Sequence, residues 1–428
     1  AQVAALNTAA IVSLTTAQVN LGLTTAQVAS LSTEQAAVLN TAQIQSLSTA
    51  QVAALVTADV AALSTAAVAA LGTTQVSQGL TTAQVVGLAT VQVASLTSAQ
   101  INLGLTTAQI AVIETQDIAA LITAQVRLGL GTAQIAALTT SQARALTTEQ
   151  ISLGLTTAQV AALTTADISS LSTEQISLGL STAQIVALTT AQAASLSSAQ
   201  LSQGFSNAQV AALETRDVAA LSTAAVAALT TTQVNQGLTT AQIVALSNTS
   251  TGQIVALTTA QIVALGTVQV AVIETQDIAA LATAQIAVLT TAQIVALTTA
   301  QVNLGLTTGQ IVALGTTQVA AIETGDIAVL TTAHVAALTT AQLKQGLSTA
   351  QLVALGSAQI AALTTAQTSL GLSTTQIVAL TTEQVNLGLT TEQINLGLST
   401  AQVAAMETQD IAALSTAQIA ALSTAQVV

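Results

Sequence analysis

The sequence lacks Cys, Pro, Trp and Tyr, and it contains a single Phe, a single Met and a single His. Without Cys the chain can form neither disulfides nor thiolate metal sites, which suits a secreted protein without disulfides better than a redox protein. A conventional globular core uses aromatic and varied aliphatic side chains, whereas Ala, Leu, Val and Ile supply nearly all the apolar residues here. These absences indicate a thin and regular core.

Charge is also scarce. Only 5% of the residues are charged, against roughly 25% in an ordinary soluble domain. The net charge of −13 comes from 17 acidic residues and four basic ones, which are Arg127, Arg144, Arg216 and Lys344. Four cations cannot form a phosphate-binding stripe, so nucleic acid and anionic lipid surfaces are excluded as partners.

Long hydrophobic runs are missing as well. The mean hydropathy of +0.73 would suit a membrane protein, but Thr, Ser or Gln interrupts the apolar residues throughout, and no run is long enough to cross a bilayer. We therefore expect no membrane insertion. The first residues, AQVAAL, lack the basic start of a signal peptide and match the second half of a repeat. The last residues, STAQVV, also stop within a repeat, so we expect both ends to be cut from a longer chain.

What is present is one repeat, continued through residues 1–428 as a single array of about fifty copies. Each repeat has eight or nine residues and begins with Leu, as in LTTAQVAA at residues 155–162. The apolar residues do not alternate with polar ones as in a strand, and Ala and Gln are poor strand formers. The repeat therefore predicts a short helix.

Every repeat also contains a signal for starting a helix. Thr156 and Gln159 match the capping box, in which the Thr hydroxyl accepts the amide proton of the third helical residue and the Gln side chain accepts that of the cap. Leu155 and Val160 occupy the positions of a hydrophobic staple. One such cap stabilises a helix by about 1 kcal/mol. Because the box recurs in every repeat, we expect the chain to begin a new helix each time.

Some repeats carry a ninth residue and end in Gly, for example at Gly22, Gly237 and Gly397. A Gly directly after a helix commonly adopts the left-handed conformation that stops it, and we expect that role here. Between residues 71 and 204 such repeats recur every 25 residues, starting at Leu71, Leu96, Leu121, Leu146, Leu171 and Leu196. This spacing predicts three helices per superhelical turn, with the wider Gly-bearing corners stacked in register.

Helices this short are unstable alone, because nucleation costs more than a few hydrogen bonds return. They must be stabilised by neighbours, with Leu and Val or Ile pointing inward and Ala allowing close approach. We predict an all-α solenoid of very short helices with about seventeen layers. An eleven-residue variant at residues 246–256 is expected to bulge outward.

One departure from the repeat recurs, with the sequence Glu-Thr-x-Asp. It occurs at Glu114 and Asp117, Glu214 and Asp217, Glu274 and Asp277, Glu323 and Asp326, and Glu407 and Asp410. Acidic residues are favourable in a first helical turn, so these are foremost a charged form of the cap. The alternative is a site for Ca²⁺ or another hard cation, although two carboxylates are too few for a full shell and EF-hand loops are absent. Glycoside hydrolysis is disfavoured because there is no aromatic platform for a sugar.

Other single departures carry no chemistry. His334 replaces a capping Gln, which we interpret as a neutral substitution, since no metal or nucleophile set accompanies it. Phe205 and Met406 replace the leading Leu and are predicted to be core residues. The many hydroxyls have no base spaced to activate them. We expect neither an enzyme nor a cofactor.

The Thr-Thr pairs suggest a further alternative. Regular hydroxyl and methyl groups on a surface of low charge resemble the surface chemistry of ice-binding proteins. The first Thr of each pair is already assigned to the cap, however, and it alternates with Ser, Asn, Gly, Glu and Val. Measurement of thermal hysteresis would test this alternative.

The LTTAQ-type repeats, continued over essentially the whole chain, resemble the long repetitive tracts of giant bacterial secreted or cell-surface proteins described as adhesin-like. This resemblance implies an extracellular or cell-surface location in a bacterium and a role as a fibre, stalk or surface layer. The main partner would be the chain itself, end to end or laterally, because the low charge offers little repulsion. An adhesin or ligand-binding module on the cell surface is the alternative.

Overall fold

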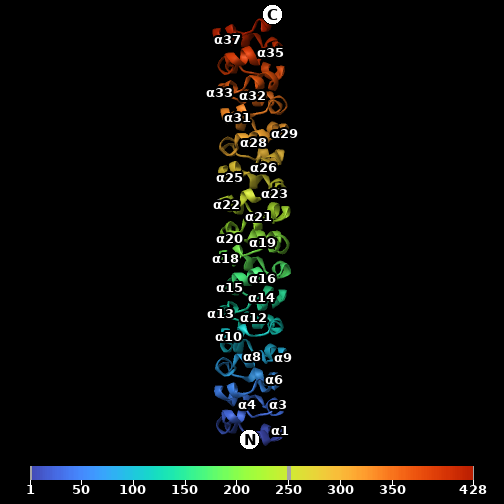
Figure 1. The fold of residues 1–428 in the computed structure, drawn as a ribbon, viewed down its shortest axis with the longest axis vertical. Coiled ribbons are helices and arrows are strands. Elements are labelled where there is room, and N and C mark those ends of the chain that lie inside the picture. The colour runs from blue at the N-terminus through green and yellow to red at the C-terminus, as the bar shows by residue number, and fades with distance from the viewer. Residues whose placement is uncertain (1, 248–251, 428) are drawn as a thin grey trace. The chain divides into compact units, whose positions relative to one another are not determined.

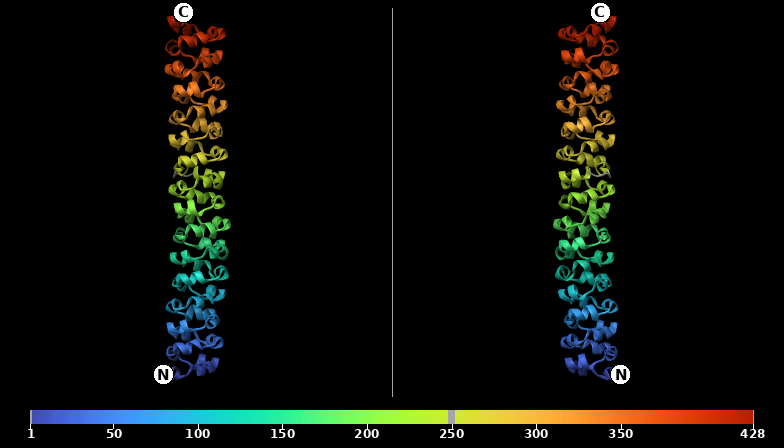
Figure 2. Two further views of the ribbon diagram at one scale, coloured as in Figure 1. Left: turned by 90° about the vertical axis from the view of Figure 1, so that its right-hand side faces the viewer. Right: turned by 90° about the vertical axis from the view of Figure 1, so that its left-hand side faces the viewer.

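The computed structural model describes residues 2–247 and 252–427. The chain forms two compact units, an N-terminal unit of residues 1–221 and a C-terminal unit of residues 222–428. Within each unit, short helices follow one another in stacked turns (Figure 1, Figure 2). No strand occurs among the described residues. The prediction of an all-α solenoid of very short helices is therefore confirmed.

The helices of the N-terminal unit are each three to seven residues long. They are η1 (Val3–Ala5), α1 (Thr8–Ser13), η2 (Gln18–Gly22), α2 (Thr25–Val28), α3 (Thr33–Ala37), α4 (Thr41–Ser46), α5 (Thr49–Ala54), α6 (Thr57–Ala62), α7 (Thr65–Ala70), η3 (Gln75–Gly79), α8 (Thr82–Val86), α9 (Thr90–Ala94), η4 (Gln100–Gly104), α10 (Thr107–Ala111), α11 (Thr115–Ala120), α12 (Thr123–Gly129), α13 (Thr132–Ile135), α14 (Thr140–Ala145), η5 (Gln150–Gly154), α15 (Thr157–Ala162), α16 (Thr165–Ser170), η6 (Gln175–Gly179), α17 (Thr182–Val186), α18 (Thr190–Ala194), η7 (Gln200–Gly204), α19 (Asn207–Ala212) and α20 (Thr215–Ala220).

The C-terminal unit continues the same pattern. Its helices are α21 (Thr223–Ala227), η8 (Gln233–Gly237), α22 (Thr240–Ser247), η9 (Ile254–Ala256), α23 (Thr259–Ala264), α24 (Thr267–Ala271), α25 (Thr275–Ala280), α26 (Thr283–Ala287), α27 (Thr291–Val295), η10 (Gln301–Gly305), α28 (Thr308–Ala313), α29 (Thr316–Ala321), α30 (Thr324–Ala328), α31 (Thr332–Ala337), η11 (Gln342–Gly346), α32 (Thr349–Ala354), α33 (Ser357–Ala361), η12 (Gln367–Gly371), α34 (Thr374–Val378), η13 (Gln384–Gly388), η14 (Gln393–Gly397), α35 (Thr400–Ala405), α36 (Thr408–Ala413), α37 (Thr416–Ala421) and η15 (Thr424–Gln426).

Two extended residues separate α15 from α16. After α15, Leu163 has φ −60° and ψ 142°, and Thr164, which caps α16, has φ −70° and ψ 160°. The amide of Leu163 donates to the carbonyl of Val160 at 3.2 Å and closes the preceding helix. Thus the chain begins a new helix at each capping box, as predicted.

The core is narrow and is built from a few positions of each repeat. In the repeat of α15, Leu155, Gln159 and Val160 are buried, while Thr157 and Ala158 are exposed. The residues that replace the leading Leu, Phe205 and Met406, are buried as well. Their prediction as core residues is confirmed.

Helices three repeats apart are stacked on each other. For example, α11 contacts α9, three repeats earlier, and α14, three repeats later. The Gly-bearing helices also contact one another in sequence, from η3 to η4, then to α12, η5, η6 and η7. These contacts confirm three helices per turn and the stacked Gly-bearing corners.

The role expected for the corner Gly residues is wrong. Among the described residues, Gly252 alone has a positive φ, of 64°. In η3 the ninth residue is instead accommodated by widening the helix into a π turn, in which the amide of Leu80 donates to the carbonyl of Gln75, five residues earlier, at 2.9 Å. The other Gly-bearing helices labelled η are π-helical too, whereas α12 remains an α-helix up to Gly129. The π-helix is rare and is found mostly as single turns of this kind.

At corners that stack closely on an earlier turn, Gly is required for space. A Cβ atom at Gly79 would lie 2.9 Å from the Cβ of Val52, and one at Gly104 would lie 3.0 Å from the Cβ of Val76. Both Val residues belong to the helix three repeats earlier. The corner Gly therefore allows the backbone of one layer to approach a β-branched side chain of the layer before it.

The eleven-residue variant is described only in part. Residues 248–251 lie outside the described residues, so the expected outward bulge lies there too.

Candidate functional site

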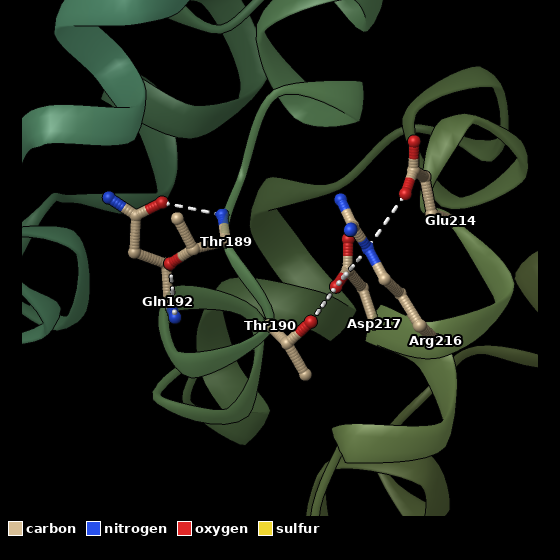
Figure 3. Close-up of polar contacts among 6 residues, drawn as sticks. All are labelled: Thr189, Thr190, Gln192, Glu214, Arg216 and Asp217. Carbon is tan, nitrogen blue, oxygen red and sulfur yellow. Dashed lines mark hydrogen bonds and ion pairs between the residues drawn. The ribbon is translucent and has the colours of Figure 1, made fainter.

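The capping box has the predicted geometry. In Figure 3 the amide of Thr189 donates to Oε1 of Gln192 at 2.8 Å, and the amide of Gln192 donates to the hydroxyl of Thr189 at 3.3 Å. The first Thr of the pair is therefore engaged by its own helix, as expected from the sequence.

The Gln side chain makes a second set of contacts that the local sequence pattern does not predict. Nε2 of Gln192 donates to the carbonyl of Val160 at 2.9 Å and to that of Leu163 at 2.7 Å. These carbonyls lie at the end of the helix four repeats earlier, where the last carbonyls lack the hydrogen bonds of the helix interior. The buried Gln thus connects the start of one helix to the end of another in the adjacent turn.

We call this series of contacts the glutamine ladder. The same pair of bonds is made in the N-terminal unit by Gln84, Gln100 and Gln142, and in the C-terminal unit by Gln310, Gln351 and Gln384. The donor is a Gln side-chain amide and the acceptors are backbone carbonyls, so both partners in these buried bonds are uncharged. The ladder therefore satisfies polar groups of the core without an ionised residue.

His334 can replace Gln because the imidazole has an acceptor and a donor. Nδ1 accepts from the amide of Thr331 at 3.4 Å, and the side chain is hydrogen-bonded to the backbone of Leu306. Burial lowers the pKa of His334, and the bond to Leu306 opposes that shift. The geometry agrees with a neutral substitution of the capping residue.

Asp replaces Gln at another set of repeats and cannot make the ladder bonds. An Asp side chain is one methylene shorter than Gln, and its carboxylate has no proton to donate. One carboxyl oxygen is buried without a hydrogen-bond partner in Asp59, Asp117, Asp167, Asp217 and Asp410. Asp59 and Asp167 are not among the candidate residues predicted from the sequence. A signal for them was present, because Asp occupies the fourth position of the box in the sequences VTAD and TTAD.

The contacts of Asp217 show how the core accommodates a carboxyl group at this position (Figure 3). The hydroxyl of Thr190, three repeats earlier, donates to Oδ1 of Asp217 at 2.8 Å. Nε of Arg216 lies 2.8 Å from Glu214 and 3.6 Å from Asp217. Burial raises the pKa of Asp217, while Thr190 and Arg216 act against this shift.

Burial likewise raises the pKa of other Asp residues at this position. Loss of solvation is the main cause for Asp117, where the hydrogen bond from Thr90 opposes it and the charge of Glu114 adds to it. The pKa of Asp59 is raised by burial too, and that of Asp410 by burial and by Glu407. A raised pKa is the expected response of a carboxyl group removed from water.

The structure separates the two acids of each Glu-Thr-x-Asp repeat. Asp117, Asp217, Asp326 and Asp410 are buried and Asp277 is partly buried, whereas Glu114, Glu323 and Glu407 are exposed and Glu214 and Glu274 partly exposed. Glu114 accepts a hydrogen bond from Gln116 at 2.7 Å, and Glu274 and Glu407 accept equivalent bonds. Each of these Glu residues occupies the cap position of its helix, but its side chain makes no capping hydrogen bond.

The donor set does not fit a complete Ca²⁺ shell, which needs six to eight oxygens. In residues 2–247 and 252–427, no three His, Cys, Asp or Glu side chains come together in a possible metal site. Cation binding by these repeats therefore stays a prediction of the sequence alone. Across the same residues, no helix has the length and apolar character to cross a membrane.

Comparison with known families identifies the repeat. A model described as the ALTTAQ repeat matches residues 1–33, 21–49, 52–90, 110–148, 210–248, 270–303, 319–344 and 403–428, which together make up more than half of the chain. No curated protein matches the chain.

Proposed function

This chain belongs to the ALTTAQ repeat family, and we propose that it is a structural protein that forms an extracellular fibre, stalk or surface layer. The regular stack of short helices is the functional element in this proposal. The chain would carry load or cover a surface, and its partner would be other copies of itself.

The glutamine ladder is the observation that carries the proposal. Gln142 joins its own helix to the carbonyls of Ile110 and Ile113, at 2.7 Å each, and Gln310 does the same with Ile278 and Leu281. Each repeat with a buried Gln thus has covalent links to its sequence neighbours and buried hydrogen bonds to the turn before. Such nearest-neighbour connections suit an array whose length can vary without change of fold.

Composition supports a role in assembly. With 5% charged residues, the surface opposes contact between chains only weakly. A location outside the cell agrees with the absence of Cys and with the acidic composition.

A non-catalytic role is supported by the placement of the acids. Asp117, Asp217 and Asp410 lie in the core with at most 2% of their surface exposed. A substrate in solution could not reach their carboxyl oxygens. The Glu residues of the same repeats are outside and take part in short-range hydrogen bonds.

Electron microscopy of the purified chain under native conditions tests the proposal. We expect filaments or sheets that contain many chains. A population that contains only single chains over the whole range of accessible concentrations would contradict it.

A further inference from the structure

One corner of the N-terminal unit carries large apolar side chains that face water. Leu103, Leu128, Leu153 and Leu178 each precede a corner Gly and are between 60% and 71% exposed. They belong to η4, α12, η5 and η6, consecutive helices that contact one another from turn to turn. We call these four residues the leucine stripe.

The stripe is unlike scattered surface leucines. If each leucine exposes on the order of 100 Å² of apolar surface, the four expose about 400 Å², a size at which patches on a monomer mark interaction sites. Two such stripes facing each other supply about 800 Å², and their flanks bring the total near the roughly 1,000 Å² that a specific interface requires.

A groove lies beside the stripe. This groove, of about 290 Å³, lies between the starts of α12 and η5, lined by residues that include Ile122, Thr123 and Glu149. The ends of these helices carry Leu128 and Leu153. A partner that contacts all four leucines must match their 25-residue period, and another copy of the chain has that period.

The charges of Arg127 and Glu149 favour an antiparallel arrangement of the two copies over a parallel one. Arg127 adjoins Leu128, and Glu149 lies one helical turn before Leu153. If two copies are antiparallel about a two-fold axis between these leucines, Arg127 of each copy faces Glu149 of the other. A parallel pair in register would place Glu149 against Glu149, which is unfavourable. Arg127 makes no ion pair with a described residue.

We propose that the leucine stripe is the lateral interface between two antiparallel copies of this chain, with Leu128 packed against Leu153 of the second copy. The interface is isologous, since the same surface is used twice. This inference rests on the proposed role in assembly and identifies the surface that would serve it.

The chain itself provides the substitution that tests the stripe. Gln78 and Gln203 occupy the same position before the corner Gly in η3 and η7, so Leu→Gln at this position is compatible with the fold. We expect the variant L103Q/L128Q/L153Q/L178Q to keep its circular-dichroism spectrum. In sedimentation velocity over a concentration series, its dissociation constant for self-association should rise at least tenfold.

Exposed valines outside the stripe provide the matched control. Val86, Val91 and Val186 are exposed at positions where most repeats have Ala, and V86A/V91A/V186A should associate like the wild type. The charge swap tests the orientation: R127E should weaken association and R127E/E149R should restore it. No restoration would overturn the antiparallel arrangement.

The outcomes separate this inference from the proposed function. If the Leu→Gln variant associates as tightly as the wild type while filaments form, the stripe is not the interface and the fibre remains. If the wild type stays monomeric in both sedimentation and electron microscopy, the fibre and the interface are both refuted.

Discussion

At the scale of the residue, the choice of Gln over Glu is informative. Either side chain can accept from the amide of the cap, so the capping box alone gives no reason to prefer Gln. The reason is the second contact, because Nε2 donates to two carbonyls in the adjacent turn, as Gln100 does with Val68 and Leu71. Glu occurs one position earlier, at Glu149 and Glu174, where it is exposed.

Replacement of a ladder Gln by Glu should therefore destabilise the fold. In Gln159→Glu, the cap bond is retained, but the two carbonyls in the adjacent turn, of Val126 and Leu130, lose their donor and face a buried charge. We expect a loss of about 3 kcal/mol in local stability near pH 7. Hydrogen exchange measured by mass spectrometry should show faster exchange in residues 123–130 and 155–162.

Ala158→Glu is the control for this substitution. It adds the same charge one position earlier, on an exposed residue, and corresponds to the natural Glu149 and Glu174. Stability should change by less than about 0.5 kcal/mol. Equal effects of the two substitutions would show that the ladder bond is unimportant.

The buried Asp residues predict a dependence on pH. Because burial raises the pKa of Asp117, the folded chain retains a proton that the unfolded chain releases above a pKa of about 3.9. The contribution of Asp117 to stability is therefore complete below that pH and is lost as the pH rises through the pKa in the folded state.

Asp117→Asn removes this titration with little change in shape. We expect the melting temperature of the variant, relative to the wild type, to rise between pH 3 and pH 7. The comparison cancels the general effect of the other acidic residues, which both proteins share. A constant difference across this range would show that Asp117 titrates alike in the folded and unfolded chain.

At this scale the sequence predicted the cap and not the ladder. The cap connects residues three apart, such as Thr189 and Gln192, and is therefore visible in a local pattern. The ladder connects residues about 32 apart, as Gln192 and Val160 are, and depends on how the turns stack. The preference for Gln at buried positions was the available signal.

At the scale of the helix, the ninth residue and its Gly define the corners. The sequence predicted their 25-residue spacing, but it assigned the Gly to a left-handed stop. Gly serves either positive φ or close backbone approach, and a local pattern does not distinguish the two. Which of the two reasons applies depends on the residue three repeats earlier. At Gly79 it is close approach, because a Cβ atom there would clash with Val52.

Substitution of Gly by Ala should depend on this neighbour. A Cβ at Gly388 would lie 3.0 Å from the Cβ of Ile360, whereas one at Gly325 would have no atom within 4 Å. We expect Gly388→Ala to lower stability by about 1 to 3 kcal/mol. Gly325→Ala should raise it by up to about 1 kcal/mol, because Ala favours the helix.

Both residues lie in the C-terminal unit, so thermal melts followed by circular dichroism compare them in one context. Stabilisation by both substitutions would mean that the corner has room for a Cβ and that Gly388 is needed for another reason.

At the scale of the whole molecule, the main contacts between described helices join neighbouring repeats or repeats three apart, and the ladder bonds join repeats four apart. Removing one complete repeat should therefore leave every remaining repeat with suitable neighbours, as expected for a one-dimensional array. Deletion of residues 130–137 and deletion of residues 188–195 each remove one eight-residue repeat from the N-terminal unit. Both variants should retain helicity per residue close to that of the wild type.

The two deletions differ in what they do to the leucine stripe. Removal of residues 130–137 shifts Leu153 and Leu178 by one of the three helices of a turn relative to Leu103 and Leu128, which divides the stripe. Removal of residues 188–195 leaves all four leucines in register. If lateral association uses the stripe, the first deletion should raise the dissociation constant at least tenfold and the second should not. Similar association by both variants, measured by sedimentation velocity, would mean that the register of this corner has no part in assembly.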